Sequence, residues 1–201
     1  MKKIAIALVA FGFATPALAQ DEPKFTGPWV AAEAGWDDVV LNDGGTSGAK
    51  SGLLYGGALG YDHEIGGAVV GVEAELTGST VKDGVNDLFV TGDRFELRAG
   101  RDIYVGGRIG AKVGKSVLLY GKAGYTNARI TGVYTSGATT VTDGTNEGGY
   151  RLGAGAEYGM GHMFARVEYR YSDYGDVKFQ GISSGVSAVR HQIAVIGGFR
   201  F

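Results

Sequence analysis

The chain has 201 residues, with 19 Lys and Arg against 21 Asp and Glu, so its formal net charge is −2. It contains 37 glycines, 3 prolines and no cysteine. This composition excludes a disulfide framework and a thiol nucleophile. It also contains no basic run that would indicate nucleic-acid binding. We therefore expect no nucleic-acid partner, and nothing in the sequence indicates a cofactor.

The start of the chain has the pattern of a secretory signal peptide. Two lysines precede an apolar run over residues 4–14, and Ala17 and Ala19 supply the small-x-small pattern of a cleavage site. We predict that residues 1–19 are removed after Ala19 and that residues 20–201 form one exported domain. Nothing after Ala19 is apolar for long enough to form a membrane helix, so a membrane-spanning role would require a closed barrel.

The remaining chain alternates polar and apolar residues with a period of two, which is typical of β-strands. Short turns and long polar connections alternate between the strands, as in barrels with short periplasmic turns and long external loops. The pattern predicts an all-β fold, namely an eight-stranded antiparallel up-and-down transmembrane β-barrel. The eight strands are expected near residues 29–36, 51–62, 68–78, 95–113, 117–130, 150–160, 163–174 and 190–201.

Each expected strand has one apolar face and one charged face. The fourth is expected to keep a single register, so that Phe95, Leu97 and Ile103 share the apolar face. Glycines such as Gly106 and Gly124 lie on the charged face, which suits a narrow interior, and aromatic residues gather near both ends of the apolar face. We infer that the apolar face meets lipid. A soluble sandwich or lipocalin-like barrel, with that face inside, is the alternative.

Charged side chains inside an eight-stranded barrel must be paired, because the interior is only wide enough for side chains to fill it. We interpret them as a structural network that plugs the lumen. A gated ion path that opens when pairs exchange partners is the alternative, although a mixture of signs does not favour selective conduction. The predicted lumen residues are Glu33, Glu73, Glu75, Arg108, Lys122, Arg151, Glu157, Arg166, Glu168, Arg170 and Arg190.

Catalysis would require a nucleophile next to a base. His63 and His162 are expected in periplasmic turns, and His191 is expected on the lipid side at the outer end of the last strand. None has a Ser and an acidic residue placed convincingly nearby. We therefore predict that the protein is not an enzyme and that it has no metal site.

Four segments resemble the small opacity-type outer-membrane proteins of Gram-negative bacteria, which are related in fold to the barrel domain of outer membrane protein A. These segments are residues 27–36, 119–125, 166–175 and 191–201. The resemblance covers essentially the whole chain after the signal peptide, and it implies a location in the cell outer membrane, among its lipids, and a monomer.

The resemblance also implies a role for the end of the chain, where an aromatic residue follows alternating apolar ones. Ile193, Val195, Phe199 and Phe201 are similar to the signal that the outer-membrane assembly machinery reads. For function, the family implies a structural or surface-antigen role with the external loops as the interaction surface. The alternatives are an adhesin that binds a host or envelope ligand through its loops, and a narrow low-conductance channel.

Two arginines lie on the outward face near the expected extracellular rim. A guanidinium can bind a phosphate with two hydrogen bonds. We therefore predict that Arg101 and Arg129 contact lipopolysaccharide, with ordinary charges at the edge of a loop as the alternative. The sequence leaves open whether the external loops are ordered as extended strands.

Overall fold

The computed structural model describes residues 23–43, 46–87, 90–137, 139–179 and 182–201. The predicted signal peptide, residues 1–19, lies outside these residues, so its cleavage after Ala19 stays a prediction. No helix in the described part of the chain is long and apolar enough to cross a bilayer. The strands are β1 (Gly27–Asp43), β2 (Thr46–Ile65), β3 (Ala68–Ser79), β4 (Lys82–Asn86), β5 (Asp93–Val113), β6 (Val117–Ser136), β7 (Thr139–Met160), β8 (Met163–Phe179) and β9 (Ile182–Arg200).

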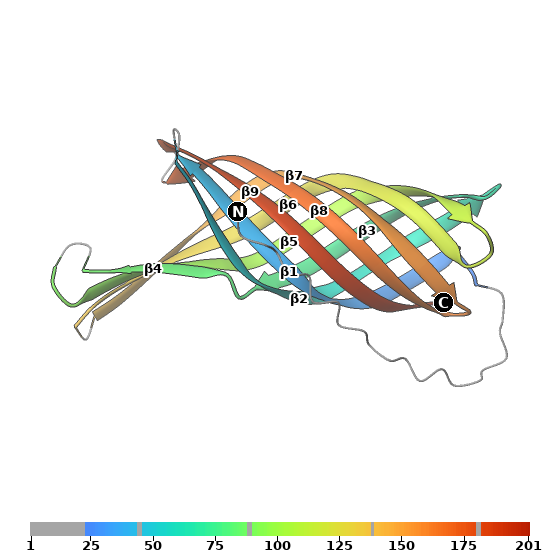
Figure 1. Ribbon diagram of the computed structural model, residues 1–201, viewed down its shortest axis with the longest axis horizontal. Helices are drawn as coiled ribbons and strands as arrows, with labels where there is room; N and C mark the ends of the chain where they lie inside the picture. Colours follow the sequence, from blue (N-terminus) through green and yellow to red (C-terminus); the bar gives the residue numbers. More distant parts are fainter. Residues whose placement is uncertain (1–22, 44–45, 88–89, 138, 180–181) are drawn as a thin grey trace, which may run out of the picture.

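Eight of these strands form a closed ring. Each is antiparallel to its neighbours in the order β1-β2-β3-β5-β6-β7-β8-β9, and β9 pairs with β1 to complete the ring. Figure 1 shows the strands tilted around a single barrel. The prediction of an eight-stranded antiparallel up-and-down barrel is therefore confirmed. The ninth strand, β4, lies in a segment predicted as a loop and pairs with β5 outside the ring.

The exposed surface of the ring is apolar, and its interior is charged. Val72 is 64% exposed and Ile109 is 63% exposed, whereas Arg151 and Glu157 are fully buried. A continuous apolar belt of this kind requires a covering, which hydrocarbon supplies. The alternative of a soluble barrel with its apolar face inside is therefore wrong.

Glycines on the inner wall make room for the large side chains of the lumen. A Cβ atom added at Gly60 would lie 2.5 Å from the ring of Trp29, and one at Gly198 would lie 2.3 Å from the ring of Phe164. At Gly124 the nearest atom would be the carbonyl oxygen of Val105, at 2.3 Å. The side chains of the lumen therefore pack directly against the backbone of the barrel wall.

The expected single register of the fourth strand is wrong. Ala99 pairs with Ile130 and Asp102 with Ala128, so Gly100 and Arg101 both lie opposite one residue of β6. This arrangement is a β-bulge. Because it inserts one extra residue, side chains beyond it change faces. Phe95 and Leu97 therefore continue the inner wall, whereas Ile103 faces lipid.

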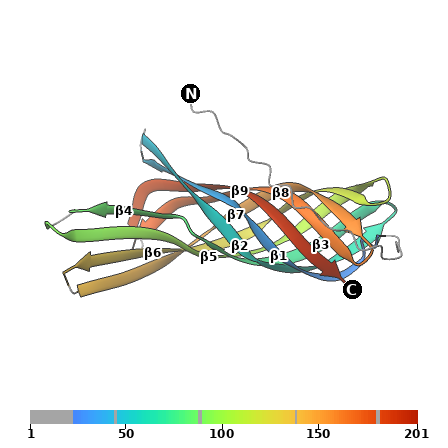
Figure 2. The same cartoon turned by 60° about the horizontal axis from the view of Figure 1, so that its bottom comes forward.

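Beyond the bulge, four strands continue as one sheet that projects from the rim. This sheet, called the blade here, consists of β4 and of residues 93–99, 130–136 and 139–145. Figures 1 and 2 show it at the end of the barrel opposite the C-terminus. A transmembrane strand needs about 9–11 residues, whereas β5, β6 and β7 have 21, 20 and 22. Much of each of the four predicted external loops is thus ordered as strand, and two of these loops contribute to the blade.

Two glycines of β6 can be used to test the tight packing of the inner wall. Gly124→Ala should lower the free energy of unfolding by about 1–3 kcal/mol, because its methyl group would meet backbone atoms that cannot move aside. Gly121→Ala is the matched control, since its nearest neighbour would lie at 3.7 Å. Urea unfolding followed by the mobility shift on gels with and without boiling measures both. Equal stability of the two variants would contradict this account of the wall.

Candidate functional site

The lumen brings together all eleven charged residues singled out in the sequence. Each is less than 6% exposed, and together with residues named below they come from every strand of the ring. These eleven are Glu33, Glu73, Glu75, Arg108, Lys122, Arg151, Glu157, Arg166, Glu168, Arg170 and Arg190.

The same interior contains further polar residues that were not included in the predicted set. They share the strand face of the predicted charges, so extending the alternation to the strand ends would have found them. They are Asp37, Asp62, Asp102, Gln192 and Arg200, all 2% exposed or less.

The middle of the lumen is organised by two cations that share carboxylates. Lys122 Nζ lies 2.9 Å from Glu73 and 2.8 Å from Glu168, and it also pairs with Glu75. Arg170 pairs with Glu33, lies 3.1 Å from Glu75 and donates to Glu168 at 2.5 Å. Each cation is therefore held from several strands at once.

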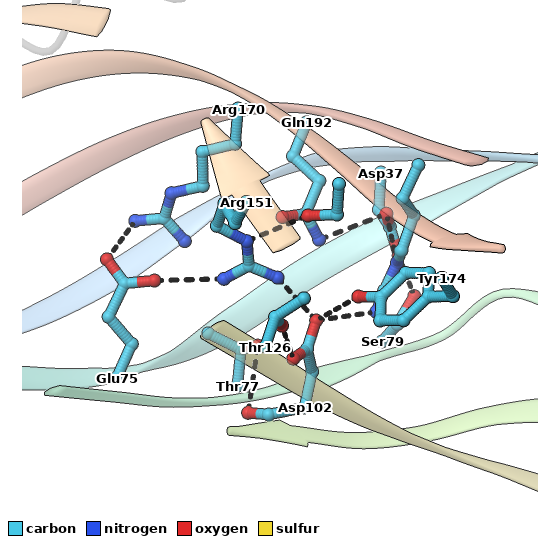
Figure 3. Close-up of polar contacts among 12 residues, drawn as sticks. Asp37, Glu75, Thr77, Ser79, Asp102, Thr126, Arg151, Arg170, Tyr174 and Gln192 are labelled. Atoms are coloured by element: carbon cyan, nitrogen blue, oxygen red, sulfur yellow. Dashed lines mark hydrogen bonds and ion pairs between the residues drawn. The ribbon is translucent and has the colours of Figure 1, made fainter. Parts of the chain in front are cut away.

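Towards the blade, Arg151 continues this network, as Figure 3 shows. Its guanidinium lies 3.0 Å from Glu75 and 2.5 Å from Asp102. Asp102 also pairs with Arg190 at 3.0 Å, and Arg190 in turn lies 2.6 Å from Asp37. Ion pairs thus extend without interruption from the middle of the lumen to its outer end.

At the opposite end, three arginines surround two carboxylates. Glu157 lies 3.1 Å from Arg108, 2.7 Å from Arg166 and 2.9 Å from Arg200. Asp62 lies 2.5 Å from Arg108 and 2.8 Å from Arg200. Here the cations outnumber the anions.

Aromatic rings fill the space between the ion pairs. The guanidinium carbon of Arg166 lies 4.1 Å from the ring centre of Trp29 and 4.2 Å from that of Phe164, and Lys122 Nζ lies 4.6 Å from that of Tyr104. Cation–π contacts of this kind strengthen when they are desolvated. Sequence analysis did not assign these rings to the lumen, although they share the strand face of the charges.

The histidines lie at the surface of the barrel. His63 is in β2, opposite Val70, and not in a turn as predicted. His162 is in the turn between β7 and β8 and stacks on Phe199, with ring centres 5.6 Å apart. His191 Nδ1 lies 2.7 Å from the hydroxyl of Tyr169. These contacts fix the orientation of the rings of His162 and His191.

The other predicted positions all lie on the outer surface. Arg101 and Arg129 are exposed and face each other across the bulge, and Arg101 donates a 3.3 Å hydrogen bond to Asn146. At the end of β9, the outward side chains are Ile193, Val195, Phe199 and Phe201. Their role in assembly stays a prediction.

The fold and its apolar belt define a barrel of the outer-membrane class. The sequence matches the family described as "Outer membrane protein beta-barrel domain" over residues 5–189, and the chain belongs to this family. Membership supports a location in the outer membrane. It also confirms the resemblance to small outer-membrane barrels that the sequence indicated.

Solved structures include similar barrels. Neisserial surface protein A is 15% identical with a TM-score of 0.56, covering 88% of this chain and 98% of that one. Ail of Yersinia pestis, solved with the heparin analogue sucrose octasulfate, is 11% identical with a TM-score of 0.49, covering 86% and 99%. The barrel domain of Pseudomonas aeruginosa OprF is 14% identical with a TM-score of 0.42, covering 83% and 97%. The likeness to Neisserial surface protein A shows the fold alone. No curated protein matches the chain.

Because the lumen carboxylates share their cations, two lysines should contribute very differently to the free energy of unfolding. Lys122→Met should lower the free energy of unfolding by at least about 3 kcal/mol, because it leaves buried carboxylates without their cation. Lys112→Met removes a half-buried pair with Glu64 near the short turns and should cost about 1 kcal/mol or less. Urea unfolding in detergent measures both. A Lys122→Met protein as stable as the Lys112→Met control would show that the network does not hold the barrel together.

Proposed function

We propose that the protein is a non-enzymatic, monomeric surface protein of the outer membrane, in which the barrel is a rigid anchor and the blade is the interaction surface. In outer-membrane barrels the short turns face the periplasm and the long connections face outward. The blade therefore stands outside the cell. The observation that carries the proposal is that its two faces differ in chemistry, and that neither continues the lipid-facing surface below it.

The outward face of the blade and of the bulge below it carries a run of exposed cations. This basic stripe consists of Lys82, Arg94, Arg98, Arg101 and Arg129. Within the described part of this face, Glu96 is the only acid, and it lies 2.5 Å from Arg98 and 3.1 Å from Arg94. Their hydrogen bonds hold the pKa of Glu96 below its usual range, so it remains charged in neutral solution. The stripe thus keeps a surplus of positive charge.

The middle of the stripe borders a shallow hollow. Lys82 and Arg98 line it, together with Thr80 and Thr131. Cations next to hydroxyl donors suit phosphate or another anionic group. Arg101 and Arg129 lie lowest on the stripe, just above the aromatic pair Tyr125 and Tyr150 that marks the membrane interface.

We infer from this position that the stripe contacts the phosphates of lipopolysaccharide and seats the barrel in the outer leaflet. Outer-membrane lipids are then its principal partners. The C-terminal residues Ile193, Val195, Phe199 and Phe201 are proposed to engage the assembly machinery before the barrel closes. An ion-paired lumen of mixed sign favours this anchoring role over a channel.

The inward face of the blade favours a second function, the binding of an external ligand in the manner of an adhesin. Val85, Phe95, Tyr134 and Val141 lie opposite one another on successive strands and form an apolar row across all four. Val85 and Val141 are each more than half exposed. An apolar row that faces water is typical of an interaction surface.

The basic stripe can be tested against lipopolysaccharide directly. The combined variant Arg98→Gln, Arg101→Gln and Arg129→Gln should bind lipopolysaccharide roughly tenfold more weakly, because three exposed charge contacts of modest strength are lost. Lys115→Gln, at the short-turn end, is the matched control and should bind normally. Titration of the detergent-solubilised proteins with lipopolysaccharide and with its dephosphorylated form measures the effect. If the wild type binds both forms equally, phosphate recognition is excluded.

A further inference from the structure

The ion pairs of the lumen divide into two networks of opposite net charge. The outer network has four cations, Lys122, Arg151, Arg170 and Arg190, and six carboxylates, Glu33, Asp37, Glu73, Glu75, Asp102 and Glu168. The inner network has three cations, Arg108, Arg166 and Arg200, and two carboxylates, Asp62 and Glu157. The inner network therefore has a surplus of one positive charge.

Tyr120 stands between the two networks. Its hydroxyl donates a 2.6 Å hydrogen bond to Glu168 of the outer network, and its ring lies 5.0 Å from Arg108 and 5.9 Å from Arg166 of the inner one. The side chain is almost completely buried. Tyr120 therefore contacts both networks, although Glu73 of the outer network also acts electrostatically on Arg108.

The inner network also holds more hydrogen-bond donors than the protein satisfies. Within the described part of the chain, five buried nitrogen atoms have no hydrogen-bond partner. One is Arg170 Nη1 of the outer network, and the other four belong to the inner one: Trp29 Nε1, Arg108 Nη1, Arg166 Nη2 and Arg200 Nε. Each of these side chains is 4% exposed or less. Arginine and the indole N–H can only donate, and the single acceptor of the cluster that also has no hydrogen-bond partner, Glu157 Oε1, cannot serve all four. Buried donors without a partner indicate a bound water or ion.

The four side chains form one compact cluster. All three guanidinium groups contact the same carboxylate, Glu157. Trp29 is enclosed by the same groups, because Arg108 lies 5.4 Å and Arg166 4.1 Å from its ring centre. Surplus charge and unsatisfied donors thus occur in the same part of the lumen.

We propose that the inner network binds a small monovalent inorganic anion of the chloride type. An anion accepts from several donors and also neutralises the surplus charge, whereas water can do only the first. Uncompensated buried charge is costly, which favours the ion. The adjacent wall is tightly packed, since Cβ atoms added at Gly60 and Gly71 would lie 2.5 Å or less from Trp29 and Asp62, and this favours the smallest anions. The site is independent of the proposed surface function.

The N-terminal segment covers this site on the periplasmic side. Phe25 is 1% exposed, with its ring 5.7 Å from the guanidinium carbon of Arg200. The carbonyl of Lys24 accepts a 2.7 Å hydrogen bond from Arg200 Nη1. Residues 24 and 25 therefore separate the cluster from the periplasm and keep the anion in a desolvated environment, where its attraction to the arginines is strong.

Halide-dependent stability tests the proposal. The refolded protein, in zwitterionic detergent, should melt roughly 2–4 °C higher in sodium chloride or bromide than in sodium gluconate of equal concentration, because a ligand that binds only the folded state stabilises it. Arg166→Gln removes the surplus charge and should abolish the difference. Glu33→Gln is the matched control in the outer network and should keep it. Crystals grown with bromide should show an anomalous peak among Arg108, Arg166 and Arg200.

One further variant and two opposing outcomes keep the test decisive. If Arg166→Gln fails to fold, Trp29→Phe removes a donor without changing the charge, and it should reduce the halide shift. Equal melting of the wild type in all three salts, with no bromide peak in the cluster, would show that water alone fills the site and would overturn the proposal. So would a full halide shift retained in folded Arg166→Gln.

Discussion

A hydrocarbon surrounding offers no partner for a peptide group and no solvation for an ion, and the main features of this barrel follow from that constraint. Every strand of the ring is hydrogen-bonded on both sides, because β1 pairs with β2 and also with β9. Charged side chains can then point only inward, into a ring just wide enough for side chains to fill. Inside, a cation such as Lys122 is stable only because several carboxylates contact it.

The same constraint accounts for the glycine content. Arginines, tyrosines and a tryptophan can fill so narrow an interior only where neighbouring inward positions of the wall have no side chain. Gly106 and Gly124, for example, back onto Tyr104, and Gly60 backs onto Trp29. The glycines, the aromatic rings and the ion pairs are therefore one packing arrangement. None of the three could be changed alone without leaving a clash, a cavity or an unpaired charge.

Where the hydrocarbon ends, the two faces of the strands change character, so that the apolar face turns inward and the charged face turns outward. The bulge at Gly100 and Arg101 lies at this boundary and shifts the register of β5 by one residue. Beyond it, apolar side chains such as Phe95 face over the barrel mouth, and cations such as Arg98 face outward. A sheet that continued the lower pattern would expose an apolar outer face to water and phosphate. The bulge allows the same strands to serve two environments.

The alternation of residues was sufficient to predict the barrel, its eight strands and the eleven inward charges, because side-chain direction along a strand depends only on the backbone period. Continued to the strand ends, it would also have included Asp62, Asp102 and Arg200. It could not predict the bulge, which inserts one residue without a clear signal among the glycines of β5. Nor could it predict that the long connections form the blade, since paired and unpaired polar segments have similar composition. Which charges pair was decided only by the tertiary structure: Arg170 and Glu33 are 137 residues apart in sequence and meet across the lumen. The opposite net charges of the two networks follow from those contacts. The contacts depend on the relative register of all strands in the closed ring, which no single strand determines.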